Sequence, residues 1–128
     1  MTYKLTSNLT KKEVFELLQS EFQFPFDVIG IEDFNWEEYY LFGPGDPEEY
    51  EKLKNTQPSY RDTFKVLDIK KGGYTEWVID SKDFLAHGQR ISDNKKFYLG
   101  LSEIKTLNKN SKNQKLLDEY NEWFYNNQ

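Results

Sequence analysis

The fold is decided between Thr63 and Leu101, where the sequence reads TFKVLDIKKGGYTEWVIDSKDFLAHGQRISDNKKFYLGL. Apolar and polar residues alternate in several short runs of this stretch, which is the period of a half-buried β-strand. The runs from Phe64 to Ile69 and from Trp77 to Ile79 each predict a strand, with the glycine pair 72–73 as a turn between them. Short strands joined by close turns favour a small, strongly bent antiparallel sheet or a barrel.

The second half of the same stretch predicts more of this sheet. Phe84 to Ala86 indicates a third strand or a connector. Arg90 to Ser92 and Lys96 to Leu101 flank the dipeptide Asp93-Asn94, which is typical of a tight hairpin turn. Upstream, the weaker alternation from Asp27 to Asp33 predicts one further strand.

Two helices are predicted before the strand-rich stretch. The first runs from about Lys11 to Phe22, because Thr10 and Glu13 have the spacing of a capping box and apolar residues follow at helical intervals. The second is short, from about Pro47 to Lys54. It is indicated by a capping aspartate followed by a proline at the first helical position.

A final helix, from about Lys112 to Tyr125, is the clearest amphipathic segment. Ser111 and Gln114 have capping-box spacing at its start. Its apolar stripe contains Leu116, Leu117, Tyr120, Trp123 and Phe124. We therefore expect Trp123 and Phe124 to be buried against the sheet.

These elements predict a single α+β domain over residues 1–128. A small, strongly bent antiparallel sheet or barrel would be flanked by the N-terminal and C-terminal helices. The alternative is an open sheet with both helices on one face.

Composition narrows the classes of function. The chain of 128 residues has no cysteine and a single histidine, which excludes disulfides and cysteine-based zinc sites. The net charge of −5 argues against a nucleic-acid surface and suits a cation or a basic protein as ligand. There is no apolar run of membrane-spanning length, and Met1 to Asn8 does not resemble a signal peptide. We expect a cytoplasmic protein that does not bind a membrane.

Carboxylates and amides gather between Glu32 and Glu51, and such oxygens are what calcium prefers. The spacing of Asp33, Asn35 and Glu37 matches the start of an EF-hand loop, but Glu38 stands where that loop needs glycine and Pro44 stands where it needs glutamate. The predicted ligands are Asp33, Asn35, Glu37 and Glu38, completed by Asp46 and Glu49. The alternative is a solvated acidic face with helix-capping acids.

Aromatic residues accompany these acids. Trp36, Tyr39 and Tyr40 would form a partner-binding patch rimmed by carboxylates, or else belong to the core. An acidic patch of this kind would suit an immunity protein or antitoxin that neutralises a basic toxin.

Catalysis is the least favoured class. A small hydrolase would have to use Asp80, Asp83 and His87, and no nucleophile motif accompanies the histidine. We expect no enzyme and no catalytic residues.

Three short matches carry a family resemblance: Phe24-Pro25-Phe26, then Leu101-Ser102 with Ile104, then Asp118 with Tyr120 and Trp123. With the order of elements, they make the chain resemble the small acidic CcbP-like calcium-binding proteins. The resemblance implies the small bent sheet, the closing helix and calcium as the ligand. The chain departs from the family in a longer segment from Glu32 to Arg61. Of the family's run of acids between early strands, only Glu76 remains.

If Glu37 and Glu38 are ligands and not structural residues, changing both to glutamine should leave the fold intact. Removing two neighbouring negative charges would even relieve repulsion.

Overall fold

The computed structural model describes residues 8–72 and 82–127. Its helices are α1 (Lys11–Glu21), α2 (Glu38–Leu41), α3 (Pro47–Leu53) and α4 (Lys112–Asn126). Its strands are β1 (Phe26–Gly30), β2 (Phe64–Lys70), β3 (Leu85–Arg90), β4 (Lys96–Gly100) and β5 (Ile104–Thr106). Two short 3-10 turns, η1 (Asn35–Glu37) and η2 (Leu101–Glu103), complete the order of elements. The α+β class with a helix at each end is therefore confirmed.

The five strands form one antiparallel sheet in the order β4-β3-β2-β1-β5. A flat sheet of this size would hold its edge strands about 19 Å apart, since neighbouring strands are about 4.8 Å apart. Yet β4 and β5, the two edges, are joined from Gly100 to Ile104, a length of chain that spans at most about 14 Å. The sheet must therefore bend strongly, as the sequence predicts.

The barrel alternative is wrong, because the bent sheet stays open. Within the described residues, β4 pairs only with β3 and β5 pairs only with β1. The short β5 and the turn η2 bring the two edges toward each other without hydrogen bonds between them. The open sheet with both helices on one side is the arrangement found.

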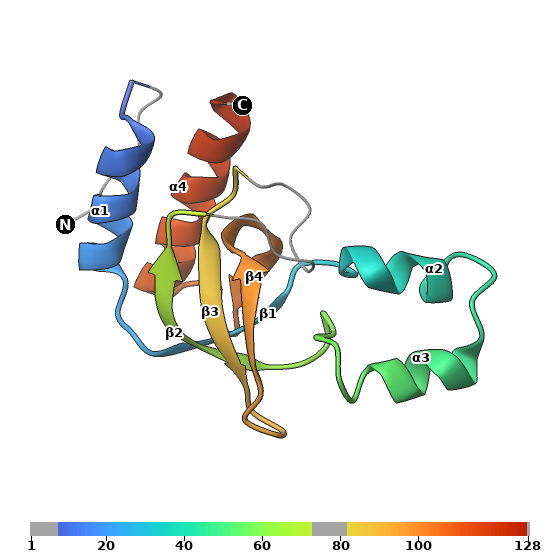
Figure 1. The fold of residues 1–128 in the computed structure, drawn as a ribbon. Coiled ribbons are helices and arrows are strands. Elements are labelled where there is room, and N and C mark those ends of the chain that lie inside the picture. Colours follow the sequence, from blue (N-terminus) through green and yellow to red (C-terminus); the bar gives the residue numbers. More distant parts are fainter. Residues whose placement is uncertain (1–7, 73–81, 128) are drawn as a thin grey trace.

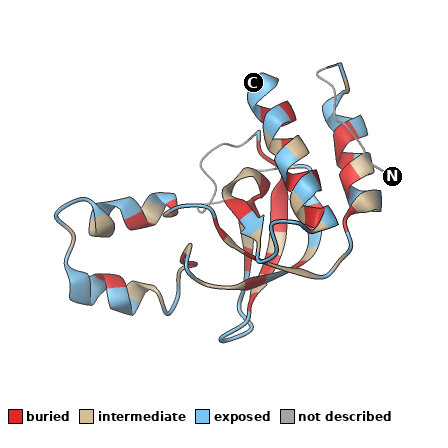
Figure 2. Ribbon diagram, turned by 180° about the vertical axis from the view of Figure 1, so that it is seen from behind, coloured by how far each residue is buried: buried red, intermediate tan, exposed pale blue. Residues whose placement is uncertain are grey.

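Helices α1 and α4 lie side by side and supply most of the helical part of the core (Figure 1). Figure 2 shows buried residues gathered where these helices meet the sheet. The largest fully buried side chains include Tyr120, Phe64, Phe84, Leu18 and Leu117. Trp123 and Phe124 are buried as predicted.

The two predicted capping boxes differ in outcome. At α1 the box is complete: the Glu13 N–H donates to Thr10 Oγ1 at 3.1 Å and the Thr10 N–H donates to Glu13 Oε1 at 2.9 Å. At α4 only the first half forms, with the Gln114 N–H donating to Ser111 Oγ. The Gln114 side-chain oxygen Oε1 instead accepts the Thr106 N–H at 2.7 Å, so it ties β5 to α4.

The predicted hairpin joins β3 and β4. Asn94 has a φ of 63°, the left-handed conformation that asparagine tolerates in tight turns. The sequence predicts the first strand of the hairpin from Arg90 to Ser92, but β3 runs from Leu85 to Arg90 and ends where that strand is expected to begin. It takes in Leu85 and Ala86 of the separate segment predicted from Phe84 to Ala86. The predicted strand from Trp77 to Ile79 lies outside the described residues.

Between β1 and β2 the chain leaves the sheet and returns, forming a separate arm that we define as residues 31–63. The arm contains η1, α2 and α3 and projects away from α1 and α4 (Figure 1). Its base closes over Gly30, whose N–H donates to the Tyr60 carbonyl at 2.9 Å. A Cβ at Gly30 would lie 2.6 Å from the Tyr60 Cβ, so this position requires glycine. Strand β1 ends here, and the prediction that it continues to Asp33 is wrong.

The closing helix provides a stability test. Trp123 is 7% exposed within the core, so Trp123→Ala should lower the free energy of unfolding by about 3–5 kcal/mol. Since a domain is stable by only about 5–15 kcal/mol, the variant should be partly or fully unfolded. The neighbouring Tyr125 is 67% exposed and is the matched control; Tyr125→Ala should change stability by no more than about 0.5 kcal/mol. Urea unfolding measures both, and equal midpoints would mean that α4 is not docked.

Candidate functional site

Glu37, one of the predicted calcium ligands, is a fully buried residue at the base of the arm. Its Oε2 accepts hydrogen bonds from the Tyr50 hydroxyl at 2.6 Å and the Ser59 hydroxyl at 2.8 Å. Its Oε1 accepts from the backbone N–H groups of Tyr60 at 2.8 Å and Phe34 at 3.1 Å. The carboxylate thus joins η1, α3 and the return of the arm to the sheet.

The environment of Tyr50 reflects the same contact. Burial, and then the hydrogen bond to the Glu37 carboxylate, raise the pKa of the Tyr50 hydroxyl well above its ordinary value. The Tyr50 hydroxyl therefore keeps its proton at physiological pH and donates it in the hydrogen bond to Glu37. For Glu37 to bind a cation as well, it would have to give up donors that are themselves buried.

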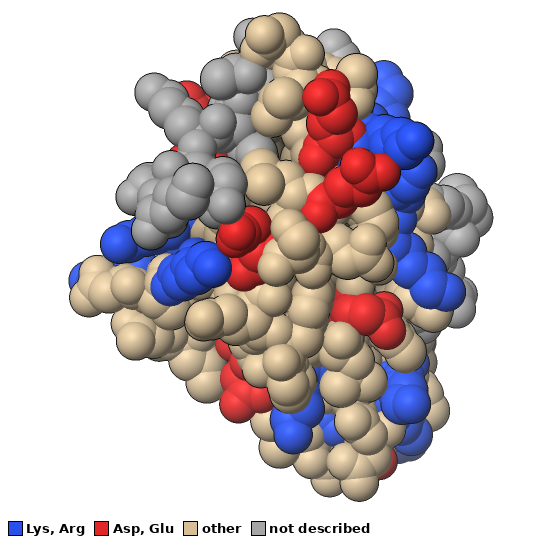
Figure 3. Space-filling model, turned by 90° about the vertical axis from the view of Figure 1, so that its left-hand side faces the viewer, with Lys and Arg blue, Asp and Glu red and all other residues tan. Residues whose placement is uncertain are grey.

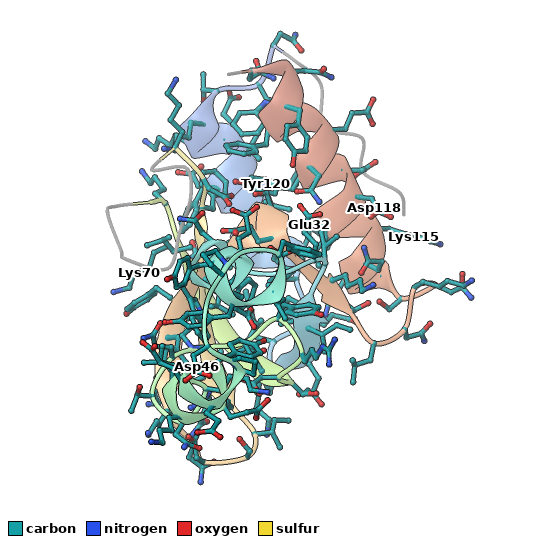
Figure 4. The ribbon with its side chains drawn as sticks, turned by 90° about the vertical axis from the view of Figure 1, so that its right-hand side faces the viewer. Glu32, Asp46, Lys70, Lys115, Asp118 and Tyr120 are labelled. Carbon is teal, nitrogen blue, oxygen red and sulfur yellow. The ribbon has the colours of Figure 1, made fainter. Side chains whose placement is uncertain are left out.

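The other predicted ligands are spread along the arm. Asp46 caps α3 by accepting the Glu48 N–H at 3.2 Å, and Glu49 accepts the Tyr40 hydroxyl at 3.0 Å. The remaining three, Asp33, Asn35 and Glu38, are half-buried or exposed. Figure 4 shows how widely the arm distributes its acids, with Glu32 at its start and Asp46 well separated from it. Across residues 8–72 and 82–127, no three or more His, Cys, Asp or Glu side chains are placed to hold a metal ion together.

Of the three residues in the predicted aromatic patch, Trp36 and Tyr40 pack inside the arm and Tyr39 is exposed. The Trp36 indole N–H donates to the Pro58 carbonyl at 2.6 Å, and its ring lies 5.6 Å from that of Tyr50. The Tyr40 ring stacks on Tyr50 at 5.7 Å and meets the Trp36 ring at 6.1 Å, so the three rings form one cluster. Tyr39, by contrast, is 56% exposed. The structure therefore puts Trp36 and Tyr40 at the edge of the arm's small core and leaves Tyr39 on its surface.

The candidate hydrolase residues His87 and Asp83 each contact other groups. The His87 ring stacks on Tyr98 with centroids 4.8 Å apart, and its Nδ1 lies 3.5 Å from Asp68 Oδ2. Asp83 is buried and bonded to other groups, whereas Asp80 lies outside the described residues.

The structure brings together a carboxylate pair that sequence reasoning missed: Asp83 and Glu103 converge above Gly100. A Cβ added at Gly100 would lie 2.6 Å from Asp83 Oδ2 and would also overlap Glu103 Oε2. Both oxygens therefore occupy the space that any other residue at this position would fill. Glycine at the end of β4 is what allows the two carboxylates to approach.

Asp83 is held in place by a hydrogen-bond network. It accepts the Ser102 hydroxyl at 2.7 Å and the Ser102 N–H at 3.2 Å. The Tyr120 hydroxyl donates to Asp83 Oδ1 at 2.6 Å and accepts the Phe84 N–H at 2.8 Å. These bonds connect the start of β3, the turn η2 and the closing helix α4.

A signal for this site was present in the sequence. Ser102 and Tyr120 are among the residues that carry the family resemblance, and both bond to Asp83. Asp83 and Glu103 themselves are 20 positions apart and belong to no spacing motif. Two carboxylates and a hydroxyl in one place are hard oxygen ligands of the kind that calcium and magnesium bind.

The comparisons with known proteins support the fold. No protein-family model matches the chain, and no curated protein matches its sequence. The crystal structure of Anabaena CcbP is similar with a TM-score of 0.54 and 16% sequence identity. The similarity covers 91% of this chain and 78% of that one. The resemblance to CcbP-like proteins is thereby confirmed at the level of the fold.

None of the helices in the part of the chain that the structure describes combines the length and the apolar character needed to cross a membrane.

The burial of Glu37 reverses the expectation for its glutamine variant. Glu37→Gln places an amide NH₂ where an acceptor oxygen stands and removes the charge that strengthens the other bonds. We expect a loss of about 1–3 kcal/mol in the free energy of unfolding. Glu38→Gln, at an exposed neighbouring position, is the matched control and should stay within about 0.5 kcal/mol of wild type. Equal urea midpoints for the two variants would contradict a structural role for Glu37.

Proposed function

We propose that this chain is a non-catalytic calcium-binding protein whose ion is held at the Asp83–Glu103 pair. The observation that carries the proposal is the convergence of both carboxylates above Gly100. The pair lies in a fold similar to that of Anabaena CcbP, and the resemblance to CcbP-like proteins implies calcium as the ligand.

Electrostatics favour a divalent cation at this place. Two carboxylates this close repel each other, and the repulsion is strong where one of them is removed from water, as Asp83 is. A divalent cation between them would replace repulsion by attraction. The bonds from Ser102 and Tyr120 fix Asp83 in advance, so little ordering of that side chain opposes binding.

The small number of protein ligands limits the affinity for calcium. Calcium takes 6–8 oxygens, and two carboxylates supply at most four, so water or other groups must complete the shell. With so few charges, we expect a dissociation constant of about 10⁻⁴–10⁻³ M.

Calorimetric titration of calcium into metal-free protein tests the function. Wild type should release or absorb heat with one binding event, and Glu103→Gln should weaken binding at least about tenfold because one of two charges is lost. Glu103 is half-buried and is the better probe, since the buried Asp83 also supports the fold. Glu38→Gln is the control and should bind like wild type.

The outcomes separate two sites. Binding that survives Glu103→Gln but is lost in Glu38→Gln or Glu49→Gln would move the ion to the ligands predicted in the arm, which stay a prediction. No heat and no thermal stabilisation at millimolar calcium would exclude calcium as the ligand altogether.

The other expectations from the sequence also stay predictions. The comparisons do not bear on an immunity-protein or antitoxin role, nor on the absence of catalysis. An assay of His87→Ala would become informative only if the wild-type protein showed a hydrolytic activity.

A further inference from the structure

The negative charge of the chain is concentrated in one segment. The arm, residues 31–63, contains nine Asp or Glu against three Lys or Arg, a net charge of −6, whereas the whole chain has −5. The remainder is therefore slightly basic. Figure 3 shows the side opposite the arm, where acidic and basic residues are interspersed. The arm is thus the acidic pole of the molecule.

Large aromatic side chains are exposed at the same pole. Phe42 is 79% exposed and Tyr39 is 56% exposed. The Tyr39 ring meets that of Tyr40 edge-on at 5.1 Å, and Gly45 packs so closely that a Cβ there would lie 2.9 Å from Tyr39 Cδ2. Tyr39 therefore presents its ring to solvent from a defined position.

The arm is anchored at both ends, which keeps this surface preorganised. At one end, the Glu37 carboxylate bonds to Tyr50 and Ser59. At the other end, the buried Arg90 of β3 donates to the carbonyls of Lys54 at 3.0 Å, Asn55 at 3.0 Å and Gln57 at 2.9 Å. Its charge is balanced by Asp62 and Asp93, each at 2.9 Å. A surface held in this way loses little conformational freedom when a partner binds.

We propose that the outer surface of the arm is a docking site for an arginine-rich segment of another protein. We define this docking surface as Glu38, Tyr39, Phe42, Asp46, Glu48 and Glu49. A guanidinium group can stack on an aromatic ring and at the same time bond to a neighbouring carboxylate, which lysine does less well. On the arm, Glu49 bonds to Tyr40, whose ring meets that of Tyr39, so a carboxylate and an exposed ring belong to one group of contacts. We expect such a surface to select arginine over lysine. The proposal goes beyond calcium binding, because this surface is separate from the Asp83–Glu103 pair.

Two synthetic peptides of equal charge and length test the proposal, one with arginine and one with lysine at alternate positions between glycines. Fluorescence anisotropy measures their binding to the full chain at about 0.15 M salt, where charges more than about 8 Å apart are largely screened. The arginine peptide should bind at least about fivefold more tightly than the lysine peptide. The double variant Tyr39→Ala, Phe42→Ala should weaken arginine-peptide binding at least about tenfold.

Control variants distinguish binding at the docking surface from nonspecific electrostatic attraction. Tyr125→Ala removes an exposed aromatic from α4 and should leave peptide binding unchanged, as should Glu103→Gln at the calcium site. Thermal melts should show the double variant folded, since both rings are mostly in solvent. Equal affinity for the two peptides, or binding unaffected by the double variant, would overturn the proposal. Self-association of wild type that the double variant abolishes would also overturn it, because a second copy would then be the occupant.

Discussion

The hydrogen bond between the Tyr120 hydroxyl and Asp83, at 2.6 Å, is the contact on which the rest of the arrangement depends. A buried carboxylate is stable only when donors surround it, so Asp83 requires both Tyr120 and Ser102. Tyr120 comes from α4 and Ser102 from η2, the turn that links the two edges of the bent sheet. Satisfying one charge therefore fixes the position of the closing helix and the curl of the sheet together.

Among the described residues, the buried carboxylates are Glu37 and Asp83, and their surroundings differ. Glu37 accepts bonds from two hydroxyls and two backbone N–H groups, so its oxygens are occupied by the arm itself. Asp83 is equally anchored, but one of its oxygens also faces Glu103 across the bare Cα of Gly100. A carboxylate that meets only donors holds a fold together. One that also meets a second carboxylate is where we propose a cation.

The two proposed binding places lie in different parts of the fold. The strands and the two long helices form the compact part, in which the Asp83–Glu103 pair lies. The arm is inserted between β1 and β2 and has a net charge of −6 on a surface of its own (Figure 1). Arg90 connects the two parts, because its guanidinium reaches from β3 to the carbonyls at the end of α3. A cation at one place and a basic segment at the other would not compete for the same side chains.

The sequence by itself determined the α+β class, the helix starts at Thr10 and Asp46, the turn at Asn94 and the burial of Trp123, because each depends on local spacing or on one residue's backbone preference. It could not determine whether the sheet closes, nor which acids are free to bind. Glu37 and Glu38 are neighbours of the same type, yet one is fully buried and the other exposed. Asp83 and Glu103 meet only because β3, β4 and η2 bring them there. The chemistry of a carboxylate depends on what surrounds it, and only the tertiary structure decides those surroundings.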